Sequence, residues 1–227
     1  MKRFLPLIIV VVVGLAALVG GAVLYQAKLP HLLKIPQDKA IPGKPDTEKM
    51  HVRGDPEAPV TIEEFGDFEC PPCGSISPFL DQLLNEYKPR LRLIFRNFPL
   101  KAHKHAREAA FAAEAAGLAG KFWEMHDVLY REQDAWTKAD NPQQLFEDYA
   151  GTIGLNVHEF KKDMESEKVQ QRVDSDHERG QSLGISKTPS LFLNSAEVAR
   201  DKLNPEGLHD VINEALKEKS GQKAEQK

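Results

Sequence analysis

The chain has 227 residues, 28% of them charged and 41% hydrophobic, and a formal net charge of −4 at pH 7. This length suffices for one well-packed domain of moderate size with an insertion. The small negative charge, spread along the chain without an acidic or basic block, gives no reason to expect nucleic acid as a partner.

Residues 1–25 are predicted to be a transmembrane anchor or a signal segment. Lys2 and Arg3 precede an apolar run from Phe4 to Leu24. A helix of that length, at about 1.5 Å rise per residue, spans roughly 32 Å, which matches the core of a bilayer. A cleaved signal peptide usually has a shorter apolar region, although the small residues Gly20–Ala22 leave cleavage open. We expect the rest of the chain to lie outside the cytoplasm.

The next elements alternate between strand and helix. Residues 26–50 are rich in proline and charge and are predicted to form an extended linker. The β-branched run Val60–Phe65 predicts a strand. Apolar residues at helical spacing then predict a helix that starts at the cysteines and ends before Pro89. Leu91–Arg96 predicts a second strand.

Helical spacing continues from residue 102 to residue 184, which predicts a helical insertion. A third strand, Ser190–Asn194, and an edge strand follow. A last helix is predicted to begin at Asn204 and Pro205, an N-cap residue followed by a residue suited to the first helical position. Residues 220–227 are predicted to be a disordered tail.

This order fits an α/β fold of the thioredoxin type. Residues 51–101 and 185–219 would form its two parts, interrupted by the helical insertion and preceded by the single transmembrane helix.

The only two cysteines, Cys70 and Cys73, are three positions apart where a strand gives way to a helix. Such a pair can open and close a disulfide, and the helix N-terminus favours the thiolate of the first sulfur. We expect Cys70 to be the nucleophile and Cys73, one turn inside the helix, to be the more buried resolving thiol. Because Pro71 and Pro72 have no N–H, the nearest donors to the thiolate are the N–H and thiol of Cys73. An inert disulfide and a zinc site completed by histidines are the alternatives.

Four motifs occur in a fixed order and cover roughly residues 51–216. They are Gly54–Pro59, the Phe-x-Cys-Pro-x-Cys-Gly block, Gly117–Trp123 and Gly184–Ser190. Together they resemble the DsbA-like branch of the thioredoxin superfamily, the bacterial envelope thiol–disulfide oxidoreductases. One departure is local: Ser195-Ala196 replaces an expected Asn-Gly turn, so we expect an irregular edge hairpin.

The resemblance implies roles for three further residues. Pro189 is similar to the cis-proline that faces the cysteine pair, and its missing N–H leaves the backbone of Thr188 free to pair with an extended substrate. Glu64 would lie beneath the active site, where a buried carboxylate with a raised pKa could accept the Cys73 proton. The adjacent Glu63 would then face solvent. The alternatives are an ordinary trans turn and two solvated carboxylates.

The direction of electron flow depends on how strongly the protein stabilises the Cys70 thiolate. The resemblance implies that a histidine helps to do so where this chain has Pro72, and Glu69 would oppose the thiolate if it pointed inward. We therefore expect a less depressed Cys70 pKa and a milder oxidant than the strongest relatives. Three histidines are interpreted as surface or packing residues of the insertion: His103, His105 and His126.

The sequence thus predicts an envelope enzyme that exchanges disulfides with exported proteins through Cys70 and Cys73, as an oxidant and without a cofactor or metal. Expected partners are thiol- or disulfide-containing exported proteins and a membrane redox partner, either a quinone-linked oxidase or a thiol reductant. The catalytic domain would lie on the extracytoplasmic side of the inner or plasma membrane, in the periplasm or at the cell exterior. The alternatives are a reductase or isomerase in redox repair or cytochrome assembly, and a redox-inactive binding or copper-delivery module.

Overall fold

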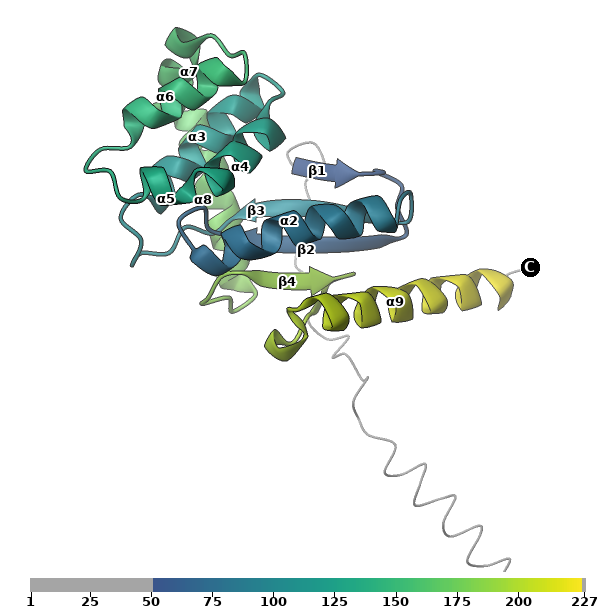
Figure 1. Cartoon of the computed structure of the whole chain (residues 1–227). Coiled ribbons are helices and arrows are strands. Elements are labelled where there is room, and N and C mark those ends of the chain that lie inside the picture. Colours follow the sequence, from purple (N-terminus) through teal and green to yellow (C-terminus); the bar gives the residue numbers. More distant parts are fainter. Residues whose placement is uncertain (1–50, 226–227) are drawn as a thin grey trace, which may run out of the picture. The chain divides into compact units, whose positions relative to one another are not determined.

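A five-stranded sheet with the strand order β1-β3-β2-β4-β5 lies at the centre of the described part of the chain, residues 51–225 (Figure 1). The strands of this computed structural model are β1 (His51–Gly54), β2 (Val60–Gly66), β3 (Leu91–Asn97), β4 (Ser190–Leu193) and β5 (Ala196–Glu197). Only β2 and β3 are parallel, and the other neighbouring pairs are antiparallel. The predicted membrane segment (1–25) and linker (26–50) lie outside the described residues. Among residues 51–225, no helix combines the length and the hydropathy that a bilayer-crossing segment needs.

The central strand β2 is buried on both faces because helices cover both sides of the sheet. On one face, Val60 and Ile62 pack in a core with residues of α2 (Pro71–Glu86) and α9 (Pro205–Glu225). On the opposite face, Phe65 packs with Phe98 and Phe192. Since side chains alternate along a strand, the neighbouring residues Glu63 and Glu64 also lie on opposite faces.

Six helices between β3 and β4 form the predicted insertion, and Figure 1 shows them grouped apart from α2 and α9. They are α3 (Ala106–Leu118), α4 (Phe122–Arg131), α5 (Gln133–Trp136), α6 (Gln143–Thr152), α7 (Val157–Met164) and α8 (Glu167–Ser182). The buried face of α3 consists mainly of alanines, which allow close approach of the helices packed against it. The predicted α/β fold with a helical insertion is confirmed.

Three details differ from the sequence expectations. The short strand β1 pairs with β3 although no strand was predicted before Val60. The β4–β5 hairpin is regular: Asn194 (φ 47°) and Ser195 (φ 75°) are both left-handed, as a two-residue type I′ turn requires. The expected irregular hairpin is wrong because Asn194-Ser195, and not Ser195-Ala196, forms the turn. Finally, α9 continues to Glu225, so residues 220–225 are helical where a disordered tail was predicted.

The predicted start of α9 is confirmed. Asn204 is followed by Pro205 as the first helical residue, and the Asn204 side-chain oxygen accepts a hydrogen bond from the N–H of Gly207 at 2.9 Å. A short 3₁₀ helix, η2 (Arg200–Lys202), precedes this cap. It brings the chain from the end of the sheet back toward α2.

Candidate active site around the cysteine pair

The two cysteines lie at the start of α2, where β2 has just ended. Cys70 is the N-cap residue, and Pro71 and Pro72 occupy the first helical positions, where a missing N–H removes no helical hydrogen bond. Both cysteines are free thiols, with relative exposures of 4% for Cys70 and 0% for Cys73. The Cys70 thiol donates to the carbonyl oxygen of Thr188 at 3.4 Å, and the Thr188–Pro189 peptide bond is cis.

A tight turn after β2 holds Cys70 in this place. The Cys70 N–H donates to the Asp67 carbonyl oxygen at 3.0 Å, and the N–H of Phe98 donates to the Gly66 carbonyl oxygen at 2.8 Å. A Cβ atom on Gly66 would lie 2.5 Å from the ring of Phe95, so only glycine fits the strand end at this point. Close packing beneath the turn therefore fixes the height of the sulfur above the sheet.

The two thiols have opposite ionisation properties. The pKa of Cys70 is lowered to about 6, chiefly because the Cys73 thiol hydrogen-bonds to its sulfur; burial acts in the other direction, and Thr188 and the Cys73 N–H lower it further. The Thr188 hydroxyl has no hydrogen-bond partner among residues 51–225 and is therefore available to the thiolate. Burial raises the pKa of Cys73, and the hydrogen bond to Cys70 and the charge of Glu64 raise it further. Cys70 is thus the thiol that ionises first.

Glu64 lies on the cysteine side of β2 and is fully buried. Neither carboxyl oxygen has a hydrogen-bond partner among the described residues. Burial, and to a lesser extent the charges on Cys70 and Asp81, raise the pKa of Glu64 to about 8. Glu64 can therefore carry a proton at neutral pH and release it within the physiological range.

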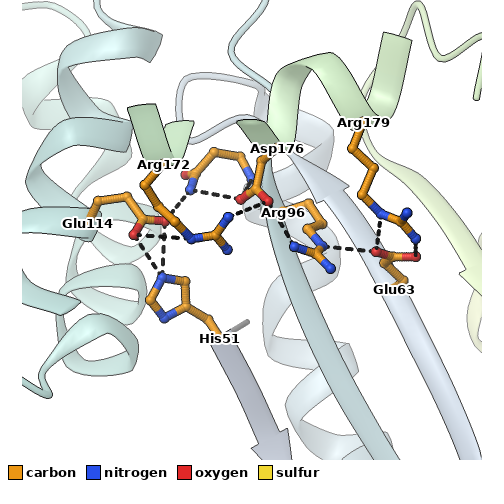
Figure 2. Close-up of polar contacts among 8 residues, drawn as sticks. His51, Glu63, Arg96, Glu114, Arg172, Asp176 and Arg179 are labelled. Atoms are coloured by element: carbon orange, nitrogen blue, oxygen red, sulfur yellow. Dashed lines mark hydrogen bonds and ion pairs between the residues drawn. The ribbon is translucent and has the colours of Figure 1, made fainter. Parts of the chain in front are cut away.

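Glu63, expected to face solvent, is instead buried beneath α8, so that expectation is wrong. Its carboxylate accepts hydrogen bonds from Arg96 Nε and from Arg179 Nε, both at 2.9 Å, and Figure 2 shows it at one end of a polar network that runs to His51. The remaining labelled members of the network are Glu114, Arg172 and Asp176. Burial alone would raise the pKa of Glu63, but Arg179 and Arg96 outweigh it and lower this pKa.

Two further carboxylates lie in the active-site turn: Glu69, which the sequence analysis considered, and Asp67, which it did not. Glu69, expected to oppose the thiolate if it pointed inward, accepts a hydrogen bond from the N–H of His105 at 2.6 Å. The carboxylate whose charge raises the Cys70 pKa is instead that of Asp67, which is buried. His103 lies 2.7 Å from Asp67 through Nδ1.

Of the three histidines read as packing or surface residues, His105 and His126 are buried. His126 packs among aromatic rings, including that of Tyr130 at 4.9 Å between centroids. The Tyr130 hydroxyl is buried without a hydrogen-bond partner in the described chain, and the charges of both cysteines and Glu64 raise its pKa beyond the effect of burial. No sequence pattern indicated Tyr130 as part of this site, since its helix lies in the insertion.

A groove of about 560 Å³ adjoins the cysteine motif. It lies between α2 and the segment that leads into α9, and it reaches both Pro72 and Pro189. Apolar side chains dominate its wall, and Arg200 contributes a charge; the other principal lining residues are Ile76, Phe79 and Leu203. Within residues 51–225, no three side chains of metal-ligating type form a cluster.

Comparison with known proteins agrees with the thioredoxin-type fold expected from the sequence. A family model described as thioredoxin matches residues 46–214. The chain is similar to the solved structure of a thioredoxin-like oxidoreductase from Silicibacter pomeroyi, with 28% identity, coverage of 74% of this chain and 93% of that one, and a TM-score of 0.63. It is also similar to oxidised BdbD from Bacillus subtilis, with 25% identity, coverage of 77% and 97%, and a TM-score of 0.66.

Curated relatives carry a different name. The chain is 40% identical over 152 residues to Na⁺/H⁺ antiporter NhaA 1 of Mycolicibacterium gilvum, which covers 66% of this chain and 24% of that protein. It is 33% identical over 167 residues to Na⁺/H⁺ antiporter NhaA of Herminiimonas arsenicoxydans, which covers 74% of this chain and 24% of that protein. The chain thus spans about a quarter of the length of the curated relatives it matches.

Proposed function

The chain belongs to the thioredoxin family, as a DsbA-like member of the superfamily, and from this premise we propose that it is a thiol–disulfide oxidoreductase acting through Cys70 and Cys73. One observation carries the proposal: two adjacent thiols, at the helix start, have pKa values shifted in opposite directions. A thiolate that forms easily is a good leaving group, whereas its fully buried partner stays protonated until needed.

The proposed reaction starts from the Cys70–Cys73 disulfide. A substrate thiolate attacks the Cys70 sulfur, the bond between the two cysteines breaks, and Cys73 leaves as a thiolate that takes the proton from Glu64. The second substrate thiolate then attacks the substrate sulfur of the mixed disulfide and releases Cys70 as a thiolate. Two electrons pass from the substrate dithiol to the protein, which ends with two reduced cysteines.

The proposed direction of electron flow is from the substrate to this protein, which would act as a mild oxidant. Stabilisation of the Cys70 thiolate favours the reduced protein and raises its reduction potential. The Cys70 pKa of about 6 supports such stabilisation, but to a smaller degree than a pKa of roughly 4 would. The alternative, a reductase in redox repair or cytochrome assembly, calls for a potential near that of thioredoxin. Equilibration of the purified full chain with glutathione measures the potential and separates the two.

The groove between α2 and α9 is the proposed binding site for the segment that flanks a partner's cysteine. An extended segment would pair with the backbone of Thr188 and place an apolar side chain against Ile76 and Leu203. Ile76→Glu and Leu203→Glu should weaken exchange with protein substrates and leave the reduction of a small disulfide unchanged. Equal losses with both substrates would remove the groove from the proposal.

The proposed setting is the cell envelope, with the catalytic domain on the extracytoplasmic side and the segment 1–25 as its membrane anchor. Exported proteins would be the substrates, and a quinone-linked oxidase or a thiol reductant in the membrane would restore the pair. The test is labelling of Cys70 in intact cells by a membrane-impermeant thiol reagent. Labelling only after lysis would refute the location.

The central experiment uses the full chain with Cys70→Ser and Cys73→Ser variants. Cys70→Ser and Cys73→Ser should both abolish the oxidation of a reduced protein substrate, because neither can form the Cys70–Cys73 disulfide. When Cys70 of the Cys73→Ser variant attacks a substrate disulfide, the mixed disulfide should accumulate, because Cys73 is not there to displace the substrate sulfur. The absence of turnover of any dithiol or disulfide by the unmodified chain would refute the function. The ion-transport activity that the curated relatives' names state is not proposed for this chain, which matches only about a quarter of their length.

A further inference from the structure

The carboxylate of Asp67 is a buried charge at the base of the turn that carries Cys70. It accepts hydrogen bonds from the N–H groups of Glu69 and Leu100, both at 2.8 Å. Its charge raises the pKa of Cys70 and so opposes the thiolate on which exchange depends. A cation placed against Asp67 would offset this effect, because a nearby positive charge favours the ionised form of an acid.

His103 is the residue in position to supply that cation. Its Nδ1 lies 2.7 Å from Asp67 Oδ2, and its side chain is 25% exposed while that of Asp67 is fully buried. The loop that carries His103 is anchored by two backbone contacts: the Leu100 N–H binds Asp67, and the His103 N–H donates to the Leu100 carbonyl oxygen at 3.0 Å. His103 can therefore exchange protons with solvent and present its charge to a carboxylate that solvent does not reach.

Other charged or titratable groups surround this loop without replacing His103. They are Glu69 in the active-site turn, Lys101 and Lys104 in the loop itself, His105 and Glu108 at the start of α3, and His177 of α8, which stacks on Phe98. Glu69 binds the His105 N–H, and the His105 ring contacts Glu108 at 3.3 Å. Within residues 51–225, Asp67 is the one acidic side chain hydrogen-bonded to His103.

We propose that His103 is a positioning residue for the cysteine pair: when protonated, it compensates the charge of Asp67 and thereby favours the Cys70 thiolate and the dithiol form of the protein. The inference rests on the proposed function of the same two cysteines. It makes the oxidising strength of the protein depend on the protonation of a histidine that lies outside the cysteine motif.

The measurement is the thiolate absorbance of Cys70 in the full chain, prepared chemically in its dithiol form. It needs no substrate and no turnover, so a chain that exchanges no disulfides would sink the proposed function without deciding this comparison. The control position is His158, an exposed residue of α7. A Cys70 pKa that is unchanged in His103→Gln would overturn the proposal.

Variants show whether the effect passes through Asp67. His103→Gln keeps a hydrogen-bond donor but loses the charge, and it should raise the Cys70 pKa, measured by thiolate absorbance, by roughly half a pH unit. Asp67→Asn should lower it, and His103→Gln added to Asp67→Asn should then have no further effect. His158→Gln is the matched control and should change nothing. A His103→Gln effect that persists in full without the Asp67 charge would refute the role assigned to this pair.

Discussion

The Cys70 thiol donates a hydrogen bond to the Thr188 carbonyl oxygen at 3.4 Å, across 118 positions of sequence. The contact joins the start of α2 to the segment just before β4, so the whole helical insertion lies between the two halves of the site. The insertion can therefore vary in length without altering the contact, provided that the sheet brings β2 and β4 together. Five predictions concern this site and the sheet that supports it.

Replacing Thr188 should change the acidity of Cys70. Its hydroxyl is buried, has no other partner among the described residues, and lowers the Cys70 pKa. Thr188→Val removes the hydroxyl at nearly constant shape and should raise this pKa by roughly half a pH unit. Thr188→Ser keeps the hydroxyl and should leave it close to the unmodified value. Thiolate absorbance measures the Cys70 pKa in all three proteins. Equal pKa values for the valine and serine variants would contradict the role assigned to the Thr188 hydroxyl.

Glu64→Gln should slow the attack of Cys73 on a mixed disulfide, which is the reverse of the first proposed step, by roughly 10- to 100-fold, because no carboxyl remains to accept the Cys73 proton. Stopped-flow resolution of a trapped mixed disulfide measures the rate, and its pH profile should lose the inflection near the Glu64 pKa of about 8. Unchanged rates across the pH range would show that water or another group handles the proton.

The same substitution should change how stability depends on pH. The folded-state pKa of Glu64, about 8, lies above its ordinary value of 4.5. The folded protein therefore retains a proton that the unfolded chain has lost, and stability falls as pH rises between these values. In the dithiol form, Glu64→Gln should gain stability relative to the unmodified chain over this range, by roughly 3–5 kcal/mol in total. Urea unfolding at several pH values measures the difference.

Glu63→Gln should have the opposite pH dependence. The pKa of Glu63 is lowered, so its stabilising effect is present at neutral pH and is lost as pH falls through the folded-state pKa. Removing one partner from buried ion pairs with Arg96 and Arg179 should cost about 3 kcal/mol at neutral pH and less in acid. The rate of disulfide exchange by the folded fraction should stay unchanged, since Glu63 faces away from the sulfurs. A slower exchange rate would show that the two faces of β2 communicate.

The hairpin turn offers a stabilising substitution. Ser195 is exposed and has φ 75°, a conformation that glycine adopts without steric cost. Ser195→Gly should therefore stabilise the domain by about 0.5–1 kcal/mol, and it creates the Asn-Gly pair that type I′ turns prefer. Asn194→Ala, the matched control at the other left-handed position, should be destabilising. Thermal unfolding of both variants is the measurement, and a lower melting temperature for Ser195→Gly would contradict the turn type.

The sequence was sufficient for features encoded locally. The spacing of Cys70 and Cys73 and the β-branched residues of Val60–Phe65 depend on a few neighbouring residues, and the structure contains the corresponding strand and helix start. Asn204 before Pro205 likewise marked the start of α9. Alternation along a strand also showed that Glu63 and Glu64 must face opposite ways.

What covers each face could not be predicted, because the covering residues are distant in sequence. Arg179 is 116 positions from Glu63, so the burial of that carboxylate could not be deduced from β2 alone. His103 is 36 positions from Asp67, and its contact depends on how the loop after β3 folds back onto the turn. Helical spacing in the insertion predicted helices there, but it could not show that Tyr130 would lie among the groups beneath the cysteines.

The pleat of β2 places an ionised carboxylate and a proton-carrying one on consecutive residues, separated only by the thickness of the sheet. Inserting a single residue within the strand ahead of them would exchange their surroundings. Glu64 would then face the arginines, and Glu63 would lie beneath the thiols as a charge without a cation. Two inserted residues would restore the original sides. This part of the chain must therefore preserve whether its number of residues is odd or even, more than the identity of the residues at the start of the strand.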